Sequence, residues 1–290
     1  MARDLEESDI AQILAEWDLT LKAEGPSRSR AQIYEVAQAD GSPAILKVYH
    51  AGTPGYEAEA PELLAVMEGH RCVRLLRASE KALLLEHLDG ALLTHIVERG
   101  GDAEATEIII DVAEAIRARR QAFTPERRLD KRFSAMFMAD PAASAVLSNA
   151  PFRTALGIAT AALDRDARGD RGMLHGDLHH TNIIGAPRHW CTIDPLPLFG
   201  EPEAEYALAL SNPSHMPRIA NDPNRQIRMA ERIHARTGLD PSRILSWGVT
   251  FAANKLAMDI LARPEDSEQH QKTETRLSSL LEAYERVPRD

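Results

Sequence analysis

The pattern of apolar residues changes near residue 88, and this change constrains the fold more than any other feature of the chain. After it, apolar residues recur mainly at the three- and four-residue spacing of amphipathic helices. Before it lie short apolar runs with strand character, at 19–22, 33–37, 44–49, 75–78 and 82–87. A strand-rich third followed by a helical remainder predicts an α+β fold with two lobes, which we place at 1–87 and 88–290.

The predicted N-terminal lobe also contains two helices. Apolar residues at roughly helical spacing predict an amphipathic helix over 5–17. A second helix is expected at 57–67, where Pro61 is tolerated only in the first turn. Between two of the strand-like runs, Asp40-Gly41 is a good signal for the tight turn of a β-hairpin.

The predicted C-terminal lobe is mainly helical. Asp102 is expected to be the N-cap of one helix, and 152–163 forms another helical run. Two short apolar runs flank Gly185-Ala186-Pro187 and predict a small β-hairpin. Three further helices are expected at 224–236, 243–261 and 268–286, of which the middle one is apolar enough to be buried.

The composition narrows the function classes. With 34 Lys and Arg against 44 Asp and Glu, the chain has a formal charge of −10, and no basic block could neutralise nucleic-acid phosphates. We therefore expect no nucleic-acid partner, whereas a cationic small molecule is compatible with the charge.

Two further observations bear on the cellular compartment. The only cysteines, Cys72 and Cys191, lack the spacing of metal ligands, so neither a disulfide framework nor a cysteine zinc site is expected. The N-terminus has no basic start followed by an apolar core, and no run approaches the roughly 18 apolar residues of a membrane span. We expect a cytoplasmic protein that does not enter membranes.

The strongest local signal is the run Leu174-His175-Gly176-Asp177-Leu178-His179-His180-Thr181-Asn182, followed by Ile193-Asp194-Pro195. Phosphoryl transfer needs a carboxylate that orients the attacking hydroxyl and accepts its proton, together with oxygen ligands for Mg²⁺. The spacing H-x-D-x-x-x-x-N is that of a kinase catalytic loop, and Asp194 follows where a second metal-binding aspartate is expected.

These motifs resemble the aminoglycoside phosphotransferases, and most closely the branch of streptomycin 6-kinase and hydroxyurea phosphotransferase. The runs Leu129-Asp130-Lys131-Arg132-Phe133 and Gly238-Leu239-Asp240-Pro241-Ser242 and the strand that ends in Lys47 also match this branch, so the resemblance covers roughly residues 15–265. It implies a protein-kinase-like bilobal fold and an antibiotic resistance kinase. ATP and Mg²⁺ are implied between the lobes, with an aminoglycoside or hydroxyurea as the acceptor.

The resemblance also implies a role for individual residues. Asp177 is the expected catalytic base, and Asn182 and Asp194 are the expected magnesium ligands. On the nucleotide side, Lys47 is expected to bind the α- and β-phosphates and to form an ion pair with Glu59 or alternatively Glu62. Ser27, in the phosphate-covering turn 25–29, is a further expected phosphate contact. Backbone groups near Glu86 and Leu88 are expected to bind the adenine.

The chain departs from this branch at a few positions. Thr181 replaces a usual glycine, and Glu201 and Glu205 replace usual aspartates. We expect Glu201, Glu203 and Glu205 to form a solvated face, and Asp259 to be a capping or surface charge rather than an acceptor contact.

Other readings of the sequence remain open. His175, Asp177, His179 and His180 could belong to a metal-dependent hydrolase. We instead expect His175 to hold the loop, and one of His179 and His180 to be packed while the other is exposed. A catalytically inactive pseudokinase and a kinase of an ordinary metabolite are the remaining alternatives, and the sequence does not determine the oligomeric state.

Overall fold

A computed structural model describes residues 7–27, 30–50, 52–140, 142, 144–187 and 189–288. The chain divides into two compact units. Unit 1 comprises Met1–Ala91 and Ile184–Leu196, and unit 2 comprises Leu92–Ile183 and Pro197–Asp290. The short segment that carries Asp194 therefore belongs to the same unit as the N-terminal strands.

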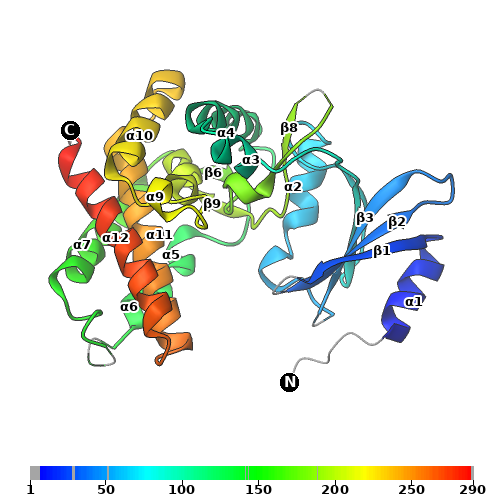
Figure 1. Cartoon of the computed structure of the whole chain (residues 1–290), viewed down its shortest axis with the longest axis horizontal. Coiled ribbons are helices and arrows are strands. Elements are labelled where there is room, and N and C mark those ends of the chain that lie inside the picture. The colour runs from blue at the N-terminus through cyan, green and yellow to red at the C-terminus, as the bar shows by residue number, and fades with distance from the viewer. Residues whose placement is uncertain are drawn as a thin grey trace. The chain divides into compact units, whose positions relative to one another are not determined.

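Unit 1 is built on one antiparallel sheet with the strand order β1-β2-β3-β5-β4. The strands are β1 (Thr20–Ser27), β2 (Ala31–Ala37), β3 (Pro43–Tyr49), β5 (Ala82–Glu86) and β4 (Leu75–Ala78). The predicted hairpin is confirmed between β2 and β3, where Gly41 has a φ of 84° and Asp40 accepts a hydrogen bond from the Ser42 amide. Helix α1 (Glu7–Glu16) lies beside this sheet, as predicted (Figure 1).

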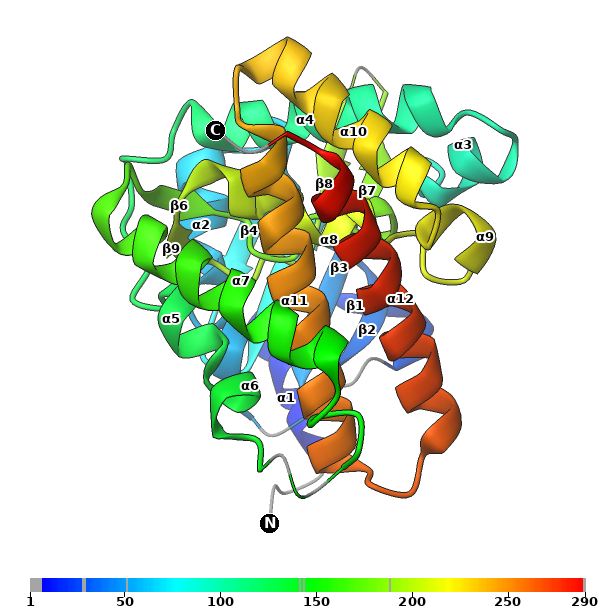
Figure 2. The ribbon, with the colours of Figure 1, turned by 90° about the vertical axis from the view of Figure 1, so that its left-hand side faces the viewer.

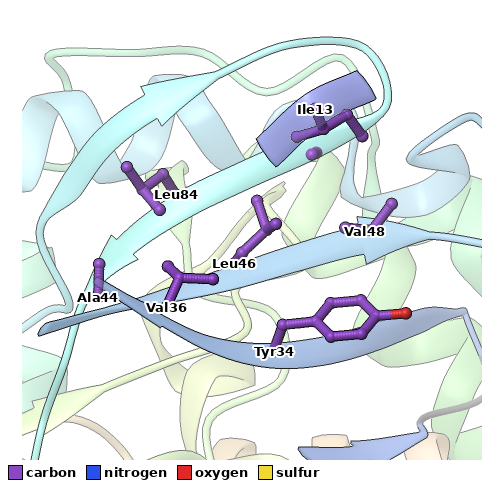
Figure 3. Close-up of a cluster of buried hydrophobic side chains, with 8 residues drawn as sticks. Ile13, Tyr34, Val36, Ala44, Leu46, Val48 and Leu84 are labelled. Carbon is purple, nitrogen blue, oxygen red and sulfur yellow. The ribbon is translucent and has the colours of Figure 1, made fainter. Parts of the chain in front are cut away.

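The alternation of side chains along the strands gives the two faces of the sheet different tasks. Because successive residues of a strand point to opposite faces, one face gathers the apolar side chains that pack on Ile13 of α1. Figure 3 shows this cluster, which contains Tyr34, Val36, Ala44, Leu46, Val48 and Leu84. The residues between them, including Ile45 and Lys47 of β3, belong to the other face.

Two further segments complete unit 1. The helix predicted at 57–67 is divided into a 3₁₀ turn, η1 (Gly55–Glu57), and α2 (Ala60–Met67), with Pro61 in its first turn. Strands β7 (Ile183–Gly185) and β8 (Trp190–Thr192) pair as the predicted small hairpin. Backbone bonds from Val73 to Thr192 and from Thr192 to Arg71 tie β8 to the chain before β4.

Unit 2 is organised around one buried helix, α11 (Pro241–Ala262), as the sequence predicts. Helices α7 (Ala150–Arg168) and α12 (Ser267–Arg286) flank it (Figure 2), and α10 (Pro223–Thr237) also packs against it. The Trp247 side chain on α11 is fully buried, and the centroid of its ring lies 5.9 Å from the ring centroid of Phe133. Shorter elements of unit 2 are α3 (Thr94–Glu98), α5 (Leu129–Arg132), α6 (Ser134–Met138), β6 (Gly172–Leu174), η3 (His180–Asn182), β9 (Leu198–Gly200), η4 (Pro202–Tyr206), α8 (Ala207–Leu210) and α9 (Pro217–Ala220).

The predicted N-cap of the next helix is wrong by one residue. Helix α4 (Asp102–Arg117) has Gly101 as its N-cap, and Asp102 is its first helical residue. The Asp102 carboxylate does not cap the helix, because it pairs with Arg225 of α10.

The described helices include none long and apolar enough to cross a membrane. Both cysteines are buried and free.

Candidate active site

Lys47 is buried between two carboxylates of unit 1. Its ammonium lies 3.0 Å from Oδ1 of Asp194 and also pairs with Oε2 of Glu57, and its side chain is only 5% exposed. Burial by itself lowers the pKa of Lys47, but the charges of Asp194 and Glu57 and their hydrogen bonds outweigh it, so the pKa lies above its usual value. Lys47 therefore carries a fixed positive charge at the end of β3.

The partner of Lys47 differs from the sequence prediction. The sequence predicts Glu59 or Glu62 on the following helix, whereas in the structure Lys47 pairs with Glu57. The reason is local geometry. The helix begins only at Ala60, so Glu59 is its N-cap, and the 3₁₀ turn before it directs Glu57 into the buried side of the sheet.

A cavity of about 180 Å³ adjoins Lys47 within unit 1. The walls of the cavity are largely apolar. Two of the predicted site residues, Lys47 and Asp194, line it with their charged side chains. The predicted adenine segment also contributes, since both Glu86 and Leu88 line the cavity, together with Pro26, Ile33, Ile45, Val73, Leu85, Ile184 and Ile193. Apolar walls with a few convergent polar groups are typical of small-molecule sites.

Two details place the remaining nucleotide-side residues. Ser27 is exposed at the end of β1, and its hydroxyl lies 3.4 Å from Nε2 of His50; the cavity lining includes Pro26 but not Ser27. Arg28 and Ser29 of the predicted phosphate-covering turn lie outside the described residues. The Glu86 carboxylate accepts a 2.7 Å hydrogen bond from the Arg74 amide, and the Glu86 amide donates to the Arg74 carbonyl at 3.0 Å.

Asp194 adopts a left-handed backbone conformation, with a φ of 53°. Such a conformation costs on the order of 1–3 kcal/mol for a residue other than glycine and persists where the surroundings hold it. Here Lys47 holds the carboxylate, which is 37% exposed beside the cavity. Strained residues of this kind cluster at functional sites.

The second group of predicted residues lies on one loop of unit 2. Strand β6 pairs with β9 and leads directly into His175 and Gly176. Gly176 has a φ of 76°, which favours glycine at this sharp turn. The fully buried His175 accepts a hydrogen bond from the Asp177 amide at Nδ1, 3.2 Å away, so its predicted role of holding the loop is confirmed.

Asp177 and Asn182 contact each other across this loop. Nδ2 of Asn182 donates to the Asp177 carbonyl at 3.0 Å and to its Oδ2 at 2.9 Å. Burial by itself raises the pKa of Asp177, but the neighbouring His179, His175 and Arg132 lower it by more, so the pKa lies below its usual value. Asp177 is therefore ionised at neutral pH and able to accept a proton or a hydrogen bond.

Half of the prediction for the two adjacent histidines is confirmed, since one is packed but the other is only partly exposed. His180 is fully buried, whereas the His179 side chain is 17% exposed and lies 3.7 Å from Oδ2 of Asp177. Thr181 stands where the family usually has a glycine, and its hydroxyl lies 2.9 Å from Nδ1 of His179, within hydrogen-bonding distance. Burial and the nearby Arg225 hold the pKa of His180 well below its usual range.

The three glutamates after β9 are not the solvated face that we predicted. Glu201, Glu203 and Glu205 are all buried. Glu201 accepts hydrogen bonds from Arg165 and from the Trp247 indole, and Glu205 accepts the backbone N–H groups of His175 and Gly176. The carboxylates of Glu201 and Glu205 satisfy buried donors, which is why these two groups tolerate the interior.

Glu205 anchors the loop just before Asp177. Its two oxygens accept the amides of His175 at 2.7 Å and Gly176 at 3.3 Å. The pKa of Glu205 is raised to about 7, mainly by burial. The two amide hydrogen bonds oppose this rise and the charge of Asp177 adds to it. Its ordinary pKa is 4.5, so between about pH 4.5 and 7 the folded protein holds a proton that the unfolded chain has released. Folding stability therefore falls as the pH rises through this window.

The Glu205→Gln variant tests this assignment, because it removes the titrating group. We expect the unfolding free energy of the variant, relative to the wild type, to increase by about 2–3 kcal/mol between pH 5 and pH 8. Urea unfolding at each pH measures the difference. The exposed Glu282→Gln serves as the control and should show no such trend, and a flat difference for Glu205→Gln as well would contradict the raised pKa.

Asp259 is not the capping or surface charge that the sequence predicts, because its side chain is buried. Its carboxylate bonds Lys255, Gln269 and Thr273 and so joins α11 to α12. Within the described part of the chain, no group of three or more His, Cys, Asp or Glu side chains is placed to hold a metal ion.

Comparison with known proteins decides the family. The model of the aminoglycoside/hydroxyurea antibiotic resistance kinases matches residues 16–258. The chain belongs to this family. This aminoglycoside/hydroxyurea kinase is 32% identical over 246 residues to a streptomycin 3''-kinase of Klebsiella pneumoniae, covering 81% of our chain and 86% of that protein. It is 35% identical over 212 residues to a hydroxyurea phosphotransferase of Kitasatospora aureofaciens, covering 70% of our chain and 60% of that protein.

A solved structure confirms the fold. The kinase resembles a thermostable mutant of an aminoglycoside phosphotransferase, solved as a ternary complex with ADP and hygromycin B, with a TM-score of 0.65. The match covers 94% of our chain and 97% of that chain at 12% identity. The predicted α+β, protein-kinase-like fold is therefore confirmed. The protein is an enzyme, a small-molecule kinase that transfers a phosphoryl group to a hydroxyl group.

Proposed function

We propose that this kinase uses ATP and Mg²⁺ to transfer the γ-phosphoryl group to a hydroxyl of a streptomycin-like aminoglycoside or of hydroxyurea. The observation that carries the proposal is the buried Lys47, held by Glu57 and Asp194 at the charged end of an apolar cavity. The names of the relatives supply the acceptor class, and antibiotic resistance is the physiological role proposed with it.

The nucleotide contacts are proposed for unit 1. The apolar lining of the cavity suits the faces of a purine ring, and the backbone near Glu86 and Leu88 offers hydrogen-bonding groups for its edge. Lys47 would bind the α- and β-phosphates, since its ammonium is already charged and fixed in place. Ser27 remains a proposed contact of the phosphates.

The proposed metal ligands fit magnesium by the chemistry of their donors. Mg²⁺ prefers oxygen ligands and few protein groups, and Asp194 offers a half-exposed carboxylate while Asn182 offers a carbonyl oxygen. Nδ2 of Asn182 is occupied by Asp177, which fixes the orientation of the amide. When bound, the metal neutralises the negative charge of the phosphates.

Asp177 is the proposed catalytic base. Its ionised carboxylate would accept a hydrogen bond from the acceptor hydroxyl, orient it for in-line attack and take its proton as the new bond forms. Such a reaction depends mainly on positioning, and the hydrogen bonds from Asn182 and to His175 hold this segment of the loop in place.

The role of Glu57 is open to a direct test. Glu57→Gln removes one of the two charges that hold Lys47, and we expect the KM for ATP to increase about tenfold, the equivalent of roughly 1.4 kcal/mol. Steady-state kinetics with varied ATP measure it. Glu59→Gln, at the partner that the sequence predicted, is the matched control and should keep the KM of the wild type. The reverse ranking would restore Glu59 as the partner.

The function itself is tested by an acceptor screen. The purified protein is incubated with ATP and Mg²⁺ and with single acceptors, including streptomycin, other aminoglycosides, hydroxyurea and ordinary hydroxylated metabolites. ADP release and the mass of the product are measured. We expect acceptor-dependent ADP release and a phosphorylated aminoglycoside or hydroxyurea. Phosphorylation of an ordinary metabolite alone would refute the acceptor class, and the lack of any phosphorylated product would refute the reaction.

A further inference from the structure

A buried arginine of unit 2 reaches the catalytic loop from α10. Arg225 is 3% exposed, and its Nε and Nη2 atoms bond the Asp102 carboxylate at 2.9–3.1 Å. Its Nη1 atom donates to the carbonyls of Ala209 and Leu210 at 3.3 and 2.7 Å, and its Nη2 atom lies 3.4 Å from Nε2 of His180. One guanidinium therefore joins α4, the end of α8 and the loop.

The direction of the last contact follows from the chemistry of the groups. A guanidinium can only donate hydrogen bonds, so Nε2 of His180 must be the acceptor. The hydrogen of the neutral ring then lies on Nδ1, which is buried. Arg225 thus specifies both the orientation of the imidazole and its tautomer.

His180 occupies a critical place in the loop, since it lies between Asp177 and Asn182. Glu205 anchors the loop before Asp177, through the amides of His175 and Gly176. The contact with Arg225 is a second anchor, placed after Asp177. Asp177 and Asn182 bond each other directly, and with both ends of the segment held, side chains outside the loop support this arrangement.

We infer that the Asp102–Arg225 pair is a positioning device, which acts through His180 to hold Asp177 and Asn182 in their productive arrangement. This inference rests on the roles proposed above for Asp177 and Asn182. Arginine suits the task because its planar fork binds the carboxylate with two nitrogens while a further N–H remains for the loop. Displacing catalytic groups by about 1 Å can cost on the order of 10²-fold in rate.

The same two helices carry a second set of ion pairs that provides a control. Arg232 and Arg236 of α10 pair with Glu107 of α4, on the exposed side of the helices. These ion pairs, with that of Arg236 and Asp111, join side chains of α4 and α10 and do not include the loop. Removing Glu107 therefore weakens the α4–α10 contact without altering the predicted anchor.

The experiment compares Asp102→Asn, His180→Leu and His180→Gln with Glu107→Gln. Asp102 is partly exposed, so its variant creates no cavity and leaves no buried carboxylate. We expect Asp102→Asn and His180→Leu to lower kcat about 10–100-fold at an unchanged KM for ATP. Amide exchange of residues 177–182 should become faster in both. His180→Gln, whose Oε1 can replace Nε2 as acceptor, should recover much of kcat.

The outcomes separate the two proposals. Equal kcat and equal exchange in Asp102→Asn, His180→Leu and Glu107→Gln would overturn the positioning role while the wild type still phosphorylates its acceptor. Failure of His180→Gln to recover activity above His180→Leu would also count against it. A wild type without phosphotransfer would instead refute the proposed function, and the exchange rates of the loop would still report whether Arg225 anchors it.

Discussion

Replacing Asp177 by asparagine should lower kcat by about 10²–10⁴-fold and leave ATP binding nearly intact. The amide retains the size of the carboxylate but cannot accept the proton of the acceptor hydroxyl. General-base catalysis typically accelerates a reaction by a factor of this order. The side chain is 27% exposed, so the change buries no new polar group. ADP release with the true acceptor measures kcat, and titration calorimetry with ATP measures nucleotide affinity.

The choice of control decides what the Asp177 result means. Asp164 is an exposed aspartate of α7 in the same unit, and Asp164→Asn should match the wild type in both measurements. If Asp177→Asn kept wild-type turnover, the assignment of the base would be wrong. Loss of ATP binding together with turnover would instead indicate a role in holding the nucleotide.

Removing the Glu201 carboxylate should reduce the unfolding free energy by about 3–5 kcal/mol. Glu201 is 3% exposed and accepts hydrogen bonds from Arg165 at 2.6–3.2 Å and from the Trp247 indole. Glu201→Ala leaves the buried indole N–H of Trp247 without its acceptor and Arg165 with only the Ser246 hydroxyl, which costs more than the intact pair contributes. Urea unfolding followed by tryptophan fluorescence measures the loss.

A surface pair provides the comparison for Glu201. Glu268 and Lys272 of α12 form an exposed i,i+4 pair, and Glu268→Ala should change stability by no more than about 0.5 kcal/mol. Glu201→Gln keeps one acceptor oxygen and should fall between the two variants. A loss below 1 kcal/mol for Glu201→Ala would show that Arg165 and Trp247 find other partners or water.

Several elements could be predicted because their signals are local. The Asp40-Gly41 turn, the apolar runs of β2 and β3 and the apolar spacing of α11 each depend on neighbours within a few residues, and the structure has all three. The catalytic loop belongs to the same class. Asp177 and Asn182 are five residues apart, so one turn of chain is enough to bring them into contact.

The site residues that sequence reasoning missed depend on long-range packing. Glu57 became the partner of Lys47 because a 3₁₀ turn precedes the helix, and the run of three glutamates between Lys47 and Leu63 carries no signal that separates them. Glu205 was identified as a departure from its family and assigned to a solvated face. It is buried because the amides of His175 and Gly176, thirty residues earlier in the chain, require its oxygens.

Arg225 had no sequence signal at all. It is one of several arginines on an amphipathic helix, and Arg228, Arg232 and Arg236 of the same helix are partly exposed. Only the packing of α10 against α4 shows that Arg225 is the one that meets Asp102 and His180.

The change of pattern near residue 88 and the loop around Asp177 were determined by the sequence alone, because hydrophobic periodicity and short-range spacing are properties of neighbouring residues. The tertiary structure decided which carboxylates serve the site. A buried charge persists only where hydrogen-bonding partners surround it, and these partners lie far along the chain. The Lys47 ammonium, for example, donates to Glu57, 10 residues away, and to Asp194, 147 residues away. Composition could count the 44 acidic residues, but only packing could separate the functional ones from the solvated majority.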